Sequence, residues 1–408
     1  MRRPPHIVTL LSALLVVVAV LGAGSAVATT IGDGPEIPYS VTTEDDTVGR
    51  LVVPDGNPTR QQATADLSSA LANDQEQVRA TLEAGQFRNA FESAPNQSAK
   101  GRVVEDALDR LETRASALQD ERQEAVRAFA QDDIGSAKLF RELGRIRAAA
   151  EGIDERATVV EEVVRQSTAI SLADTTTAKL AGIDGELLTL RGPLTTRLTA
   201  SLQGESAPRS ITVLGGETGA VLATIEDGTF VREATLWSER AESGTNQFAD
   251  GDGPPLSRAY ERAQETYPWA VENMVSGLSV TGFGDSTVYA VQLTHSHGDL
   301  TTYLDGRTTN VFYEVQHLQL SRLPTETVAT NTTDDLRIEV SSTAVGPAVV
   351  TARNATTGKE VIAEITVETE AANRSAIDSR LWLLETAEEQ TITARRPDGT
   401  TVSITIGA

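Results

Sequence analysis

Two long apolar seams constrain the fold more than any other feature of the sequence. In the first, which Arg122 interrupts, an apolar residue recurs every three or four positions: Val104, Leu108, Leu111, Ala115, Leu118, Ala125, Phe129. A polar turn at 131–135 leads to the second: Leu139, Leu143, Ile146, Ala150, Ile153, Ala157, Val160, Val164. The short turn favours an intramolecular antiparallel helical hairpin, while a dimerising coiled coil is the alternative for the same spacing.

Helical spacing also flanks the hairpin. Four residues upstream lie on one face of a further predicted helix: Leu67, Leu71, Val78 and Leu82. Downstream, residues 180–202 are apolar at mixed spacing and are broken by Gly185 and by Gly192-Pro193. We therefore expect a helical hairpin or bundle over 59–205.

Past Pro208 the apolar period drops to two, which predicts strands on both sides of a helix near 256–274. The pattern L-x-T-x-x-D-G occurs at 222–228 and again at 300–306, which hints at two related halves, although chance could produce so short a match. We expect an α+β domain over 206–325.

The last region, 326–408, alternates polar and apolar residues in six short runs separated by turn signals. This pattern predicts a small antiparallel β-sandwich, with Trp382 as its core anchor. The complete chain is thus expected to be a multidomain α+β protein.

The first 28 residues have the form of an export signal. Arg2 and Arg3 precede the apolar run 7–21, and small residues end at Ala28, after which cleavage is expected. The same stretch is long enough to serve as an uncleaved membrane anchor. Residues 29–58 are rich in turn formers and acids and are interpreted as a linker. Whether or not residues 1–28 are cleaved, we expect the rest of the protein to lie outside the cytoplasm. It would be either secreted or anchored to the membrane by residues 1–28 alone.

Charge and cysteine content exclude several classes of function. The formal net charge is -23, from 58 acidic and 35 basic residues, and there is no cysteine. Nucleic acid is therefore a disfavoured partner, and disulfides, thiolate metal sites and a cysteine nucleophile are excluded. Only four of the basic residues are lysine. At molar ionic strength the screening length is ~3 Å, so such a polyanion suits brine.

Candidate sites are few. His295, His297 and Asp299 form an H-x-H-x-D pattern that could hold zinc, with His317 or Glu314 as further ligands. Asp250 and Asp252 could bind a cation weakly. No complete catalytic or cofactor motif occurs, so we expect no cofactor and no enzyme. Four N-x-S/T triplets are glycosylation candidates: Asn96, Asn331, Asn354 and Asn373.

Three resemblances add expectations. The helix near 256, the runs 287–291, 303–306 and 311–314, and His297-Gly298 resemble a PepSY-type module, which implies an extracytoplasmic protein that restrains a protease or binds a small ligand. Together with the acidic hairpin, 222–234 and 303–319 resemble an uncharacterised family of haloarchaeal envelope proteins. The last region, with a hairpin at 353–358, is similar to transthyretin-like or immunoglobulin-like modules, which implies adhesion or spacing.

Our leading hypothesis is a non-enzymatic envelope protein that contacts another envelope protein or a cell-wall component in high salt. A modulator or inhibitor of an exported protease is the second hypothesis. A metal-dependent hydrolase using His295 and His297 is the third.

The composition itself makes a testable prediction. We expect the mature protein to lose its structure in dilute buffer and to regain it in molar KCl, because salt screens the repulsion among its acids. Circular dichroism during a KCl titration measures this change. A signal that stays flat across the titration would contradict the prediction.

Overall fold

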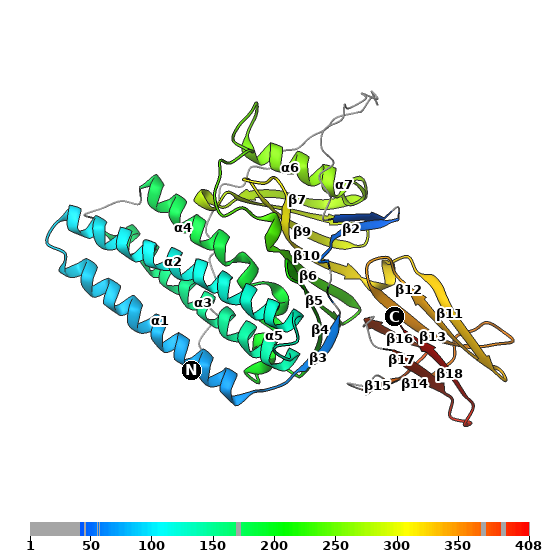
Figure 1. The fold of residues 1–408 in the computed structure, drawn as a ribbon. Coiled ribbons are helices and arrows are strands. Elements are labelled where there is room, and N and C mark those ends of the chain that lie inside the picture. Colours follow the sequence, from blue (N-terminus) through cyan, green and yellow to red (C-terminus); the bar gives the residue numbers. More distant parts are fainter. Residues whose placement is uncertain are drawn as a thin grey trace, which may run out of the picture.

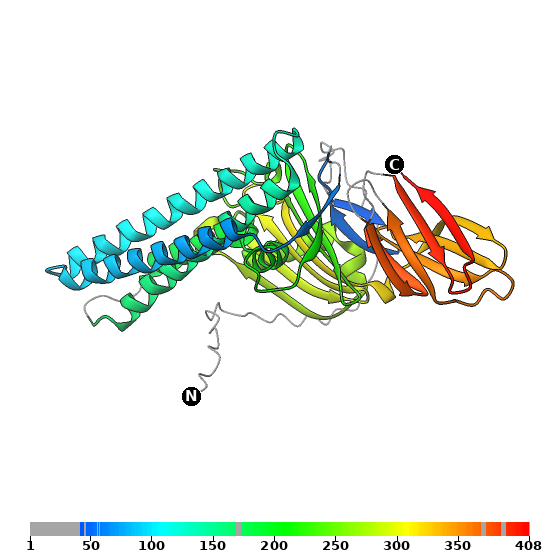
Figure 2. The ribbon, with the colours of Figure 1, turned by 90° about the horizontal axis from the view of Figure 1, so that it is seen from below.

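The computed structural model describes residues 41–44, 46–54, 56, 58–168, 173–368, 373–384 and 389–407. A helical bundle lies on one side of a central sheet, and a β-sandwich follows on the other side (Figures 1 and 2). The export signal predicted over 1–28 lies outside the described residues. Within the described part, no helix is long and apolar enough to cross a membrane.

The bundle contains α1 (Leu67–Ser93), α2 (Gln97–Ala130), α3 (Ser136–Gln166), α4 (Asp174–Leu187) and α5 (Pro193–Leu202). The two seams meet between α2 and α3, where Leu108, Leu118, Ile146 and Ile153 are buried together. In the structure α2 and α3 thus pack on each other within one chain.

Helix α1 differs from expectation. Its predicted apolar face is solvent-exposed, and a different set of residues is buried: Ala80, Ala84 and Phe91. The small Ala80 lies against Gly152 of α3, where the lack of a side chain allows close approach of the two helices. The sequence pattern thus identified an apolar stripe on this helix, but not the face that packs against α3.

The central sheet has eight antiparallel strands in the order β3-β4-β5-β6-β10-β9-β8-β7. Its strands are β3 (Thr59–Ala63), β4 (Arg209–Gly215), β5 (Gly219–Glu226), β6 (Thr229–Leu236), β7 (Met274–Gly282), β8 (Val288–His295), β9 (Gly298–Asp305) and β10 (Val311–Gln319). The repeated L-x-T-x-x-D-G segments lie in β5 and β9, at equivalent places on either side of the central β6–β10 pair. Strand β3 precedes the bundle in sequence yet joins this sheet, so the expected boundary at 205/206 does not separate two independent units.

Two layers cover the sheet. The bundle packs on one face, where Phe140 and Leu198 contact Val213 and Leu222. The other face carries α6 (Pro255–Thr266), α7 (Pro268–Glu272) and a hairpin of β1 (Val41–Glu44) and β2 (Thr47–Leu51). This hairpin occupies the described part of the region expected to be a linker, and its Val48 and Leu51 are fully buried.

The described residues of the C-terminal region form eight strands rather than the six predicted, in two four-stranded sheets ordered β11-β12-β13-β16 and β15-β14-β17-β18. They are β11 (Glu326–Thr333), β12 (Leu336–Ser342), β13 (Pro347–Asn354), β14 (Ala363–Glu368), β15 (Asn373–Asp378), β16 (Arg380–Leu384), β17 (Gln390–Arg395) and β18 (Thr401–Ile406). The prediction for Trp382 is wrong. Leu381 and Leu383 point into the sandwich core, so Trp382 points outward and packs on the central domain.

A buried ion pair fixes β2 against the central strands. Arg232 on β6 donates to Glu314 on β10 at 2.7 Å and to the Leu51 carbonyl at 2.5 Å. The Leu51 N–H and the Tyr267 hydroxyl donate to the other oxygen of Glu314, at 2.9 and 2.6 Å. Burial lowers the pKa of Arg232 and raises that of Tyr267, because the charged form of each loses water. Each charge is thus satisfied by several partners.

Replacing Glu314 should test this pair. We expect Glu314→Ala to lower the free energy of unfolding by about 3–5 kcal/mol, because Arg232 is left charged and unpaired in the interior. Urea unfolding in molar KCl measures the change. The exposed Glu265, which pairs with Arg262 on α6, is the matched control. Its replacement by Ala should cost under about 1 kcal/mol, and equal losses in the two variants would contradict the assignment.

Candidate functional site

The predicted zinc ligands are packing residues around Trp269. The ring centroids of His295 and His297 are 6.2 Å apart, and they lie 5.4 and 4.6 Å from the Trp269 ring. His295 is fully buried, and its Nδ1 accepts the backbone N–H of His297 at 3.2 Å. Burial, with His297 nearby, lowers the pKa of His295 to about 4, and burial also lowers that of His297.

The further zinc ligands considered are unavailable to the histidine pair. Glu314 is held by Arg232, and His317 lines a cleft on the bundle face, opposite to Trp269. Asp250 and Asp252 are exposed in the loop before α6. Among the described residues, no group of three His, Asp or Glu side chains could hold a metal ion.

The glycosylation candidates differ in what their amides do. The Asn96 oxygen caps α2 by accepting the Ala99 N–H at 2.9 Å, while the residue stays exposed. The side-chain NH₂ groups of Asn331 and Asn354 donate to the Ser403 carbonyl and to Asp335, at 2.6 and 3.3 Å. Asn373 begins β15, and its side chain lies outside the described part. The geometry thus favours Asn96 as an acceptor.

A second buried charge pair, which the sequence analysis missed, docks the bundle on the sheet. Arg122, the charged interruption of the first seam, donates to Thr235 at 3.0 Å. Glu233 accepts the Leu194 N–H at 2.9 Å at the start of α5. Burial raises the pKa of Glu233 and lowers that of Arg122, and each charge partly offsets the other's shift. The position of Arg122 within an apolar seam was the sequence feature that could have indicated these buried contacts.

A cleft of about 460 Å³ opens beside this pair. Tyr303 and Tyr313 stack on its floor with centroids 4.8 Å apart. Burial, with Glu233 and Asp184 nearby, raises the pKa of Tyr303 to about 12. Arg191 at its rim is paired with Asp154 and Asp184. The ion pairs of Arg191 therefore join α3 and α4 at the rim of this cleft.

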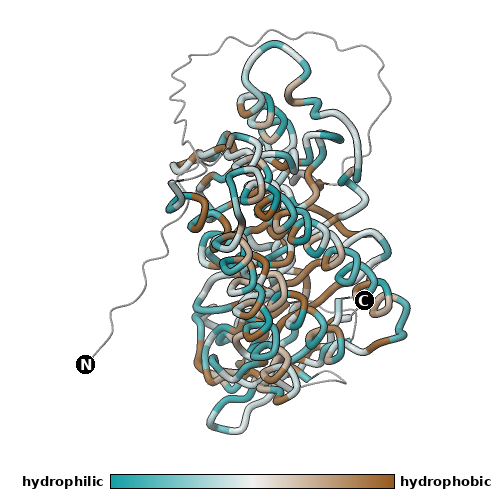
Figure 3. Tube along the Cα trace, turned by 90° about the vertical axis from the view of Figure 1, so that its left-hand side faces the viewer, coloured by the Kyte–Doolittle hydropathy of each residue, from teal (hydrophilic) through white to brown (hydrophobic). Residues whose placement is uncertain are grey.

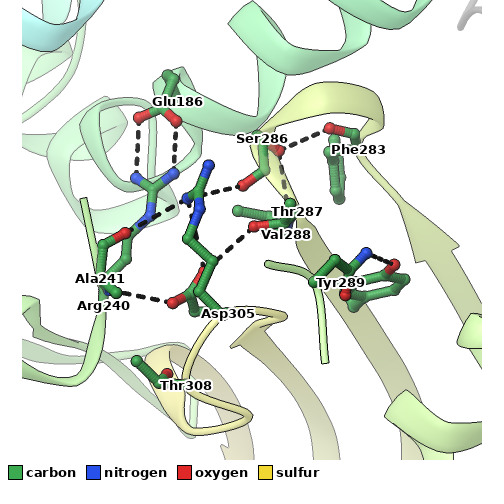
Figure 4. A network of polar contacts seen from close by, with 12 residues as sticks. Glu186, Arg240, Ala241, Phe283, Ser286, Thr287, Val288, Tyr289, Asp305 and Thr308 are labelled. Carbon is green, nitrogen blue, oxygen red and sulfur yellow. Dashed lines mark hydrogen bonds and ion pairs between the residues drawn. The ribbon is translucent and has the colours of Figure 1, made fainter. Parts of the chain in front are cut away.

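Another polar network ties α4 to the second half of the sheet (Figure 4). Arg240 makes a two-pronged contact with Glu186 of α4, at 2.9 and 2.5 Å. Asp305, in the second D-G turn, accepts the Ala241 N–H at 3.0 Å. Arg307 donates to the Ala241 carbonyl at 3.3 Å. The polar groups of this turn thus stabilise the contact with the segment around Ala241.

The surface that offers space to a partner is a groove of about 610 Å³ between α1 and α2, with α3 beneath. Its floor is mostly apolar: Ala84, Phe87, Ala90, Val103, Ala107, Leu111, Ala149 and Val160. Both α1 and α2 pack on α3 but splay from each other, which leaves the groove open (Figure 1). Figure 3 looks onto this bundle and shows apolar segments among polar ones along its helices.

Arginines outnumber acids around the groove. Its lining contains Arg79, Arg110, Arg114 and Arg156 but only two acids, Glu76 and Glu83. Arg156 pairs with Glu83, and Arg79 pairs with Glu76 at 3.3 Å. Among the described residues Arg110 has no ion-pair partner, and it is exposed. Arg114 pairs with Glu121 at 2.7 Å. Arg110 is therefore the one uncompensated cation among the described residues that line this apolar floor.

Family models match three consecutive parts of the chain. A model described as a domain of unknown function (DUF7096) matches residues 1–207, which is more than half of the chain. A family of unknown function (DUF7094) matches 211–324, the region with the PepSY-type resemblance. An archaeal fibronectin-III type-like domain matches 327–403, in agreement with the observed sandwich. No curated protein and no solved structure matches.

The buried histidine predicts a pH dependence. Because the folded-state pKa of His295 lies below the ordinary value, the unfolded chain binds its proton more readily, and stability should fall as pH drops from about 6.5 towards 4. NMR titration of the ring protons should give a midpoint near 4 for His295. His295→Gln should flatten the pH dependence of unfolding more than His317→Gln does. A His295 midpoint near 6.5 would refute the prediction.

Proposed function

The chain belongs to the DUF7096 family, and we propose that it is a non-enzymatic envelope protein that works outside the cytoplasm, in high salt, by binding another envelope component. The groove on the bundle is the observation that carries this proposal. The apolar run before residue 29 and the acid-rich composition support the location.

The chemistry of the groove suggests the partner. An apolar floor flanked by cations suits an amphipathic helix that inserts apolar residues and presents carboxylates to the arginines. On α1 the lining runs from Glu76 to Ala90, which corresponds to about 21 Å of helix, or roughly four turns of a partner. We therefore propose a helical segment of an acidic envelope protein as the ligand.

The arrangement of the domains fits this role. The bundle and the sandwich lie on opposite sides of the central sheet (Figure 2), and the groove is lined by helices of the bundle alone. Fibronectin-III-like sandwiches share the architecture of immunoglobulin-like modules, for which spacing or adhesion is our expectation. The sandwich would then act as a spacer between the groove and the point at which the protein is attached to the envelope.

A second candidate function uses the PepSY-like region, as a modulator of an exported protease. Strand β7 is an unpaired edge of the sheet, and Val275 on it is 63 % exposed. Such an edge can add an extended peptide as a further strand. Register shifts between β7 and β8 interrupt its regularity, so the groove remains our first choice.

Filling the groove should abolish partner binding. Ala90 is exposed and lines the groove, so Ala90→Trp should fold normally and block it, and Arg110→Glu should weaken binding by reversing a rim charge. Asn89→Trp and Arg102→Glu are matched controls on residues outside the lining. In a pull-down in molar KCl, we expect the wild type and both controls to retain one envelope protein, and the two groove variants to lose it or retain less of it.

Two outcomes would overturn the proposal. One is a partner retained equally by the groove variants and the controls. The other is turnover of generic ester, phosphate or peptide substrates by the purified protein, with activity lost on replacing its own residues.

A further inference from the structure

Helix α1 has two apolar faces, and only one of them is covered. Leu67, Leu71, Val78 and Leu82, here called the α1 stripe, are 76, 59, 59 and 61 % exposed. At about 100° of rotation per residue the stripe occupies a sector of about 60°, roughly opposite the side that Ala80, Ala84 and Phe91 bury. Leu67 with Leu71, and Val78 with Leu82, form two exposed apolar pairs on this face, with Asp74 and Gln75 between them. Such clustering on one face marks an interaction surface rather than a scatter of surface residues.

We infer that the α1 stripe binds a second copy of this chain through antiparallel pairing of the two α1 helices. The spacing of the stripe reads the same in both directions along the helix. About a two-fold axis between Asp74 and Gln75, Leu67 meets Leu82 of the second copy and Leu71 meets its Val78. Such a self-complementary patch is the requirement for a closed two-fold dimer.

The size of the stripe sets the strength of the dimer. From Leu67 to Leu82 it spans about 22 Å, and eight large apolar side chains meet across the axis. A single helix pair of this length falls short of the about 800 Å² per copy that standard stable interfaces bury. The dimer is therefore reversible and depends on concentration.

Charge makes this dimer depend on salt. Along 67–82 the charged residues are Asp74, Glu76 and Arg79, and the latter two are paired with each other. Asp74 lies beside the axis, close to Asp74 of the second copy, and the two carboxylates repel each other. A screening length of ~3 Å at molar ionic strength removes this repulsion and that between the two polyanionic bodies.

Two other occupants are conceivable. The chain's own apolar run 7–21 is separated from β1 by residues 22–40, and a wild type that stays monomeric would favour this occupant. The groove lies on a different flank of α1, so a partner bound there leaves the stripe exposed. The inference therefore does not depend on the proposed function.

Single cysteines test the pairing directly, because the natural chain has none. In the protein purified from its own cells, at molar KCl, Gln75→Cys should form a disulfide-linked dimer under mild oxidation, since the two positions meet at the axis. Leu67→Cys should not, because its equivalents are about 22 Å apart. The double variant Leu67→Cys with Leu82→Cys should cross-link again. Equal cross-linking of Gln75→Cys and Leu67→Cys would overturn the antiparallel register.

Light scattering tests the association without cross-links. The wild type should shift from monomer to dimer with concentration in molar KCl, and Leu71→Ser with Val78→Ser should remain monomeric with an unchanged circular dichroism spectrum. Met274→Ser with Val275→Ser is the control at an exposed apolar site elsewhere, and should still dimerise. Asp74→Asn should strengthen the dimer at least several-fold at moderate salt but not in molar KCl. A wild type that stays monomeric, or a stripe variant that dimerises equally, would refute the inference.

Discussion

The pairing of β6 with β10 is the constraint on which the rest of the structure depends. Consecutive residues of a strand point to opposite faces, so Arg232 and Glu233 send one charge into each covering layer. Arg232 donates to Glu314 and to the β2 backbone, and Glu314 also accepts the Tyr267 hydroxyl. On the other face, Glu233 holds the start of α5 near Arg122. Because an unpaired interior charge is costly, both layers are tied to the same two strands.

Local periodicity predicted the helical hairpin, the central strands and the alternation of the sandwich, because each of these patterns is set by neighbouring residues. It could not predict contacts between segments that are far apart in the sequence. Nothing near Thr59 shows that β3 pairs with β4, about 150 residues away, and the α1 stripe does not reveal which face α3 covers. The prediction for Trp382 was wrong for the same reason. The size of the side chain predicts that it is buried, but the strand register decides which domain it packs against.

Sequence patterns singled out particular residues, but only the fold supplies their surroundings. The H-x-H pattern names residue types, but burial against Trp269 decides their chemistry, and burial is a property of the whole sheet. Arg122 was the more informative residue, because a charge within an apolar seam requires a polar partner, which Thr235 of the sheet supplies. The groove could not be foreseen, since it arises from the splay of α1 and α2 on α3.

Salt acts unequally on these features. Exposed pairs are screened at molar ionic strength, whereas the buried contacts of Arg232 and Arg122 are shielded from solvent ions. The salt requirement that the composition predicts would therefore come from repulsion among surface acids, and screening of that repulsion would permit contact between two acidic molecules. Helix α1 has the groove on one flank and its exposed stripe on another. Since the stripe and the groove share no residue, the dimer inferred above would leave both of its grooves open to the proposed partner.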